Sequence, residues 1–181
     1  MNDMGTQLTY QELLAAYNKL LRENEFLHKE VDRLQALLNN KDIPCSIERS
    51  RSGNGAHVWI FFEQPLPASK ARRLGNTILT EAMERNGRMT FKSYDRFFPN
   101  QDRLPEGGFG NLVALPLQGK TRKEGNSVFV DEDFMVYEDQ WNYLLQIKRI
   151  SETTIDAILP KHGTDSELGE LSTTSESKPW S

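Results

Sequence analysis

The sequence predicts an α+β fold in which a long N-terminal coiled-coil helix precedes a small domain with a mostly antiparallel sheet. Residues 9–39 contain neither Pro nor Gly, and their apolar side chains recur in a seven-residue pattern, which is typical of a coiled coil. Short apolar runs separated by turn residues follow between residues 43 and 130, and such runs indicate strands. The length of 181 residues suits one domain with an appendage. We therefore expect a coiled coil over 1–41, a folded domain over 42–151 and a tail over 152–181.

The predicted N-terminal helix begins with a capping box, because Thr9 is followed three residues later by Glu12. With Tyr10 at heptad position a, Leu occupies all four d positions, and Asn24 occupies one a position. A buried Asn pair can fix the register of a parallel dimer. The alternative is an amphipathic helix that lies on its own domain. The predicted dimer seam, for a homodimer or a heterodimer, contains Leu13, Leu20, Asn24, Leu27, Val31 and Leu34.

The elements of the domain follow in order. Residues 45–49 are predicted to form a short strand, and residues 57–63 a second strand that is apolar on both faces and therefore central. Residues 67–85 have helical spacing and end before a glycine. Further strands are predicted at 111–117 and 127–130. A last helix is predicted at 137–150, with Trp141, Leu144, Leu145 and Ile147 facing inward.

The turn between the first two predicted strands is the best candidate for binding an anion. Two glycines spaced by one residue, Gly53 and Gly55, allow backbone amides to approach a phosphate closely. Ser52 adds a hydroxyl donor, Arg51 a positive charge and His57 a ring at the start of the next strand. Together these groups would suit a triphosphate. The simpler alternative is an ordinary hairpin with a structural histidine.

Asp95 is the second candidate, because it stands between aromatic residues on a short predicted strand. An acidic residue in such a position needs a metal ion or an Arg partner if it is buried. The alternative is an exposed carboxylate at a strand end that pairs with Arg96 or Arg103.

Three segments, SGNGAHVW, FFPNQD and GFGNLVALPLQ in this order, resemble the primase-polymerase domain of TOTE-type conflict-system proteins, a branch of the archaeo-eukaryotic primase superfamily. The resemblance covers roughly residues 42–151, and it implies a primase-type α/β domain that transfers nucleotides with two Mg²⁺ or Mn²⁺ ions. It also implies catalytic roles for His57 and Asp95, with Asp95 at the metals. The phosphate contacts would come from Ser52, Gly53, Gly55 and His57.

The chain departs from this family at the first catalytic motif. The family carries an Asp-x-Asp pair on a strand before the segment that contains the Gly-rich turn, whereas here only Asp42 precedes Ile43 and Pro44. The one Asp-x-Asp in the chain, at 131–133, lies on the wrong side of the other motifs. One carboxylate cannot hold two cations against their mutual repulsion. We therefore expect an internally truncated, catalytically incomplete domain, or alternatively an interaction module that pairs through its zipper with a full-length relative.

Charge and composition agree with a cytoplasmic protein that binds nucleotide or DNA. The net charge is −4, but residues 45–125 hold 13 basic and 8 acidic residues, and a basic region is where a polyanion would bind. The single Cys45 excludes an internal disulfide, and no apolar run has the roughly 20 residues of a membrane span. Residues 152–181 are rich in Ser, Thr and acidic residues, which predicts a disordered acidic tail.

Overall fold

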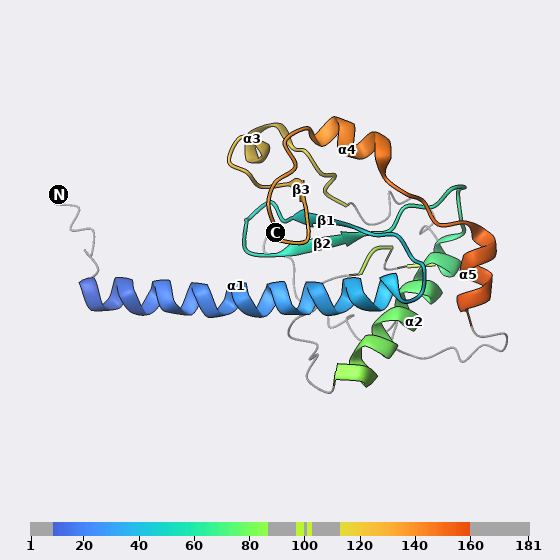
Figure 1. Cartoon of the computed structure of the whole chain (residues 1–181), viewed down its shortest axis with the longest axis horizontal. Helices are drawn as coiled ribbons and strands as arrows, with labels where there is room; N and C mark the ends of the chain where they lie inside the picture. Colours follow the sequence, from blue (N-terminus) through green and yellow to red (C-terminus); the bar gives the residue numbers. More distant parts are fainter. Residues whose placement is uncertain (1–8, 87–96, 100, 103–112, 160–181) are drawn as a thin grey trace, which may run out of the picture.

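The computed structural model describes residues 9–86, 97–99, 101–102 and 113–159. Its longest element is helix α1 (Tyr10–Asn39), whose C-terminal half lies beside a three-stranded sheet while its N-terminal half extends away from the rest of the described chain (Figure 1). Helix α2 (Ala68–Asn86) contacts the C-terminal end of helix α1. Helix α5 (Glu152–Ile158) lies close to α2. The predicted α+β class is confirmed. None of the described helices is long and apolar enough to cross a membrane.

The two halves of α1 have different surroundings. The capping box at its start is confirmed, because the Thr9 hydroxyl accepts a hydrogen bond from the Glu12 amide and the Glu12 carboxylate accepts one from the Thr9 amide. The apolar residues of the first three turns are exposed, namely Tyr10, Leu13, Leu14, Tyr17, Leu20 and Leu21. The second half packs on the chain's own domain through Leu27, Val31, Leu34, Leu37 and Leu38. Three residues of the predicted dimer seam, Leu27, Val31 and Leu34, therefore face the chain's own core.

The sheet contains β1 (Ser46–Arg49), β2 (Ala56–Trp59) and β3 (Val128–Val130) in the order β2-β1-β3. Both pairs are antiparallel, as predicted. The middle strand in the described part of the chain is β1, and not the predicted strand 57–63. The chain after β2 instead pairs with the segment before α5, where the Ile150 amide donates to the Phe61 carbonyl at 2.8 Å and the Glu63 amide donates to the Ile150 carbonyl at 3.0 Å.

The register divides the sheet into an apolar face and a polar face. Ile47 lies opposite Val58 on one side and Val130 on the other, and this face packs on α1. The next residue, Glu48, lies opposite His57 and Phe129 on the second face. Side chains alternate along a strand, so Glu48 and His57 are placed together on the side away from α1, whereas Arg49 shares the face of Ile47 and donates to the Phe134 carbonyl.

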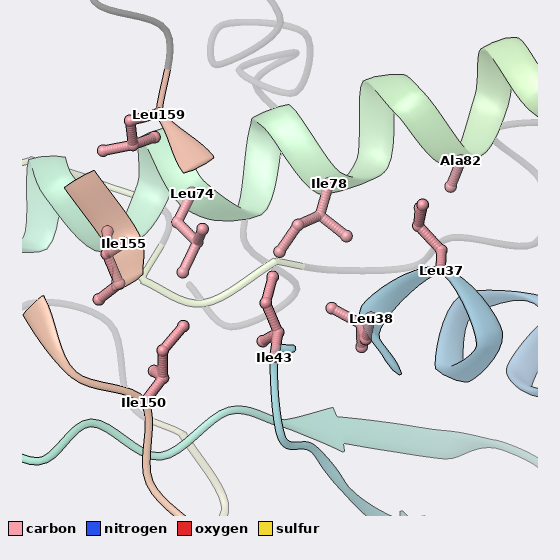
Figure 2. Packing of buried hydrophobic residues seen from close by; sticks show 9 residues of the cluster. All are labelled: Leu37, Leu38, Ile43, Leu74, Ile78, Ala82, Ile150, Ile155 and Leu159. Carbon is pink, nitrogen blue, oxygen red and sulfur yellow. The ribbon is translucent and has the colours of Figure 1, made fainter. Parts of the chain in front are cut away.

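A second apolar cluster joins α1, α2 and α5 (Figure 2). Ile155 of α5 is fully buried in it, and Leu159 is buried beside it. Ser151 caps this helix by accepting from the Thr154 amide, and Lys70 of α2 forms ion pairs with acidic residues of α5. Residues 152–159, which the sequence analysis assigned to the tail, therefore contribute to the core.

The region around α4 (Gln140–Gln146) also differs from the prediction. The helix is shorter than the predicted span 137–150, and Trp141 and Leu145, predicted to face inward, are 61% and 87% exposed. The side chain of Gln140 explains the position of the helix, since its amide group binds both the amide and the carbonyl of Phe129 on the edge of β3 away from β1. A short helix, α3 (Gly119–Arg122), precedes β3, and residues 113–115 of the predicted strand 111–117 are not in a strand.

Candidate functional site

The predicted anion-binding turn is the hairpin that joins β1 and β2. The Ser50 amide donates to the Gly55 carbonyl at 2.8 Å, the Gly53 amide donates to the Ser50 carbonyl at 3.0 Å, and the Gly55 amide donates to the Ser50 hydroxyl at 3.0 Å. Gly53 has a φ of 79°, a conformation that favours glycine, whereas Gly55 does not have a positive φ. The amides of both predicted glycines are therefore used within the turn, which makes the hairpin a preformed scaffold for its side chains.

The side chains at the tip of this hairpin are exposed. Arg51 and Ser52 both face solvent, and the Ser52 hydroxyl lies 3.2 Å from the Ser50 hydroxyl. Gly53 packs closely against Asn126, since a Cβ atom at that position would lie 2.9 Å from the Asn126 side-chain oxygen. A positive charge and a hydroxyl therefore lie close together at the turn.

His57 is the second residue of β2 after the turn, and a buried carboxylate contacts its ring. Its Nδ1 is 3.1 Å from Oε2 of Glu48, the residue directly opposite on β1. The His57 side chain is 49% exposed, whereas Glu48 is only 1% exposed. Glu48 also accepts hydrogen bonds from the Trp59 indole at 2.7 Å and from the Ser127 hydroxyl at 3.1 Å. A fixed carboxylate therefore lies behind a ring that a ligand can reach.

An aromatic row extends from His57 along the same face of the chain. The ring of Trp59 lies edge-on to His57, with centroids 6.5 Å apart, and Phe61 stacks on Trp59 at 6.2 Å and an interplanar angle of 21°. Trp59 and Phe61 are both partly exposed. Aromatic faces of this kind can stack with nucleobases.

Glu48 is the site residue that the sequence prediction missed. It is the only acidic residue in the run SIER, and strand alternation places it on the face opposite to the buried Ile47. Pairing residues 46–49 with 56–59 across the predicted turn would have set Glu48 opposite His57. An acidic residue with that neighbour was the available signal.

The predicted metal site cannot be compared with the geometry. Asp95 lies outside the described residues, so its roles in catalysis and in binding Mg²⁺ or Mn²⁺ stay predictions. Within the described residues, no group of three or more His, Cys, Asp or Glu is placed to hold a metal ion. The Asp-x-Asp at 131–133 forms a turn after β3, where the Asp131 carboxylate accepts from the amides of Asp133 and Met135.

These features define an α+β domain with a Ser-Gly hairpin that leads into a half-exposed histidine. The model of the TOTE conflict system archaeo-eukaryotic primase domain matches residues 14–158. The chain therefore belongs to this family. The matched range includes most of α1 and all of α5, in agreement with the packing of both helices in the core. No curated protein matches the chain.

Proposed function

We propose that this protein is a primase-like nucleotide-binding protein that cannot polymerise nucleotides by itself. The observation that supports the proposal best is the half-exposed His57, positioned beside a Ser-Gly turn in a domain of the primase family. The exposed Arg51 and Ser52 at the same hairpin supply a charge and a hydroxyl for a phosphate. The ligand that these groups suit is the triphosphate of a nucleotide, or a DNA phosphate at the same place.

The proposed lack of polymerase activity rests on the sequence before β1. Nucleotidyl transfer by two metals requires carboxylates that hold both ions, and the chain has no Asp-x-Asp pair before the hairpin. The Asp-x-Asp at 131–133 uses Asp131 to close its own turn. We expect that the purified chain does not extend a primer with Mg²⁺ or Mn²⁺. Extension that is lost in Asp95→Ala would contradict this part of the proposal.

Titration of a labelled deoxynucleoside triphosphate in the presence of Mn²⁺ tests the binding. We expect saturable binding by the wild type, weakened about tenfold or more in His57→Ala and Arg51→Ala, because a hydrogen bond to a charged group contributes about 1.5–3 kcal/mol. The matched control is Arg73→Ala, which removes an exposed arginine from α2. Equal affinities of His57→Ala and the wild type would contradict the proposed site.

We also propose that two copies of the chain associate through the N-terminal half of α1. Its exposed apolar stripe is too long to be left in water without a partner surface, and the domain does not cover it. Asn24, also exposed, lies at position a of the same stripe and would face its copy in a parallel pair. The seam that remains for a partner contains Leu13, Leu20 and Asn24, with Tyr10 and Tyr17 at the other a positions.

A second candidate function is an interaction module that pairs with a full-length primase relative. Leu14 and Leu21 favour it, because they are exposed at position e and widen the stripe beyond the a and d positions of a two-stranded coil. In this case the purified chain would be monomeric and would bind no nucleotide. It would instead co-purify with a relative that carries its own Asp-x-Asp pair.

A further inference from the structure

We infer that helix α3 and the tip of the β1–β2 hairpin together form a surface that binds the phosphate backbone of a nucleic-acid strand. This basic surface consists of four exposed cationic residues, namely Arg51, Lys120, Arg122 and Lys123. Arg51 also belongs to the proposed nucleotide site. The inference goes beyond that site, because the other three residues lie on α3 and at its C-terminal cap and take no part in it.

The fold holds α3 against the hairpin. The helix lies at the same end of the sheet as the turn between β1 and β2 (Figure 1). Asn126, which follows α3, packs on Gly53 at the tip of the hairpin. Beside it, Nη1 of Arg49 on β1 donates to the Gly125 carbonyl at 2.9 Å. Two segments that are far apart in the sequence therefore lie side by side.

The backbone after α3 forms a closed turn. The Thr121 carbonyl accepts hydrogen bonds from the amides of Glu124 and Asn126, each at 3.0 Å. Gly125 has a φ of 75°, which glycine adopts without strain. The cationic side chains thus extend from a backbone that its own hydrogen bonds hold in place, and such preorganisation lowers the entropy that binding costs.

The charge of the basic surface is not neutralised within the described chain. None of its four cations forms an ion pair with another described residue, whereas Lys41, Lys70 and Arg72 elsewhere all pair with carboxylates. The one acidic residue in segments 50–55 and 118–126 is Glu124. Because the whole chain carries a net charge of −4, attraction of a polyanion must come from a local surface of this kind.

The aromatic residues of β2 favour a nucleic acid over an acidic protein segment as the ligand. The hairpin leads directly into the strand that carries Trp59, whose ring stacks on Phe61 with centroids 6.2 Å apart, and both rings are partly exposed. Cations for the backbone combined with aromatic rings for the bases are typical of surfaces that bind single strands. An acidic peptide would use the charges alone.

The experiment measures binding of a fluorescently labelled, single-stranded oligodeoxythymidine to the full chain by anisotropy at a series of salt concentrations. Each phosphate contact contributes about 0.7 to the slope of log affinity against log salt for a single strand. The combined variant Lys120→Ala, Arg122→Ala and Lys123→Ala should therefore lower the slope by about 2 and weaken binding about a hundredfold at about 0.1 M salt. The matched control combines Arg22→Ala, Lys29→Ala and Arg73→Ala, which removes three exposed cations from α1 and α2 and should leave the slope near the wild-type value.

Glu124→Gln provides a test of opposite sign. It removes the acidic side chain next to the basic surface, so it should strengthen binding of the oligonucleotide. A gain of affinity cannot result from misfolding, so this variant decides the matter even if the combined variant does not fold. The combined variant retains Arg51 and His57, and we expect it to bind a deoxynucleoside triphosphate as the wild type does.

Several results would overturn the inference. They are a wild type that does not bind the oligonucleotide at low salt, an unchanged slope in the combined variant, an equal loss in the matched control, or no gain in Glu124→Gln. Competition by oligoglutamate as effective as that by unlabelled oligonucleotide would identify an acidic peptide as the ligand instead. If the wild type binds the oligonucleotide through the basic surface but binds no deoxynucleoside triphosphate, the proposed nucleotide site fails and this inference stands.

Discussion

At the scale of single residues, the sequence identified the hairpin side chains but not the group behind them. Arg51, Ser52 and His57 are exposed at or beside the turn. Of the two glycines in the turn, only Gly53 has a positive φ. Glu48 was missed because its role depends on the pairing of β1 with β2, which composition does not reveal and which only the register establishes.

The thiol of Cys45 gives a prediction at this scale. Burial raises the pKa of Cys45 from 9.0 to about 11. Well below pH 9 the thiol is protonated in both the folded and the unfolded chain. As the pH rises from about 9 to about 11, the unfolded chain releases this proton first, so the free energy of unfolding falls. We expect the fall to be smaller in Cys45→Ala, as measured by urea unfolding at a series of pH values.

Thiol reactivity provides an independent check of the same shift. Since the thiolate is the reactive form, Cys45 in the folded chain should react with a disulfide reagent at pH 8 roughly a hundredfold more slowly than in the urea-unfolded chain. Equal rates in the two states would show that the thiol is not protected by burial.

At the scale of elements, the strands near the turn and helix α2 were predictable, while the two last helices were not. Predicted residues 67–85 correspond closely to α2 (Ala68–Asn86), because helical spacing and a following glycine are both local signals. The helix at 137–150 was predicted too long, since Gln140 binds the edge of β3 and places Trp141 and Leu145 in solvent. Helix α5 was assigned to the tail because its composition is polar, although Ile155 and Leu159 are spaced to bury one face.

The position of Ile155 gives a prediction for α5. Because Ile155 is 0% exposed in the cluster with α1 and α2, Ile155→Ala should lower the free energy of unfolding by about 2–5 kcal/mol. The control is Leu145→Ala on α4, which truncates an exposed side chain and should change the value by about 0.5 kcal/mol or less. Urea unfolding measures both. A small effect of Ile155→Ala would mean that α5 is not part of the cooperative core.

At the scale of the whole molecule, one heptad pattern serves two purposes. The sequence predicted a continuous seam from Tyr10 to Leu38, and a periodicity cannot indicate whether its partner is another chain or the chain's own domain. The structure shows that the domain covers the second half of α1 and leaves the first half exposed (Figure 1). The division falls near Asn24, the single polar residue among the a and d positions.

This division predicts opposite outcomes for two identical substitutions on α1. Leu20 at position d is exposed, whereas Leu38 at position a is 1% exposed in the domain core. Leu20→Ala should weaken self-association, measured by sedimentation over a range of protein concentrations, because it removes apolar area only from the proposed pair. At low concentration, where the chains are dissociated, it should leave the free energy of unfolding within about 0.5 kcal/mol of the wild type.

Leu38→Ala should do the reverse. It should lower the free energy of unfolding of the dissociated chain by about 2–5 kcal/mol, because it leaves a cavity among Ile43, Ile78 and their neighbours. Association through the N-terminal half should persist while the domain is folded, because that half of α1 does not contact the cavity. If both substitutions lowered the stability of the dissociated chain equally, the first half of α1 would also pack on the domain. If Leu38→Ala had no effect on stability, the helix would be an independent appendage, and the division near Asn24 would be wrong.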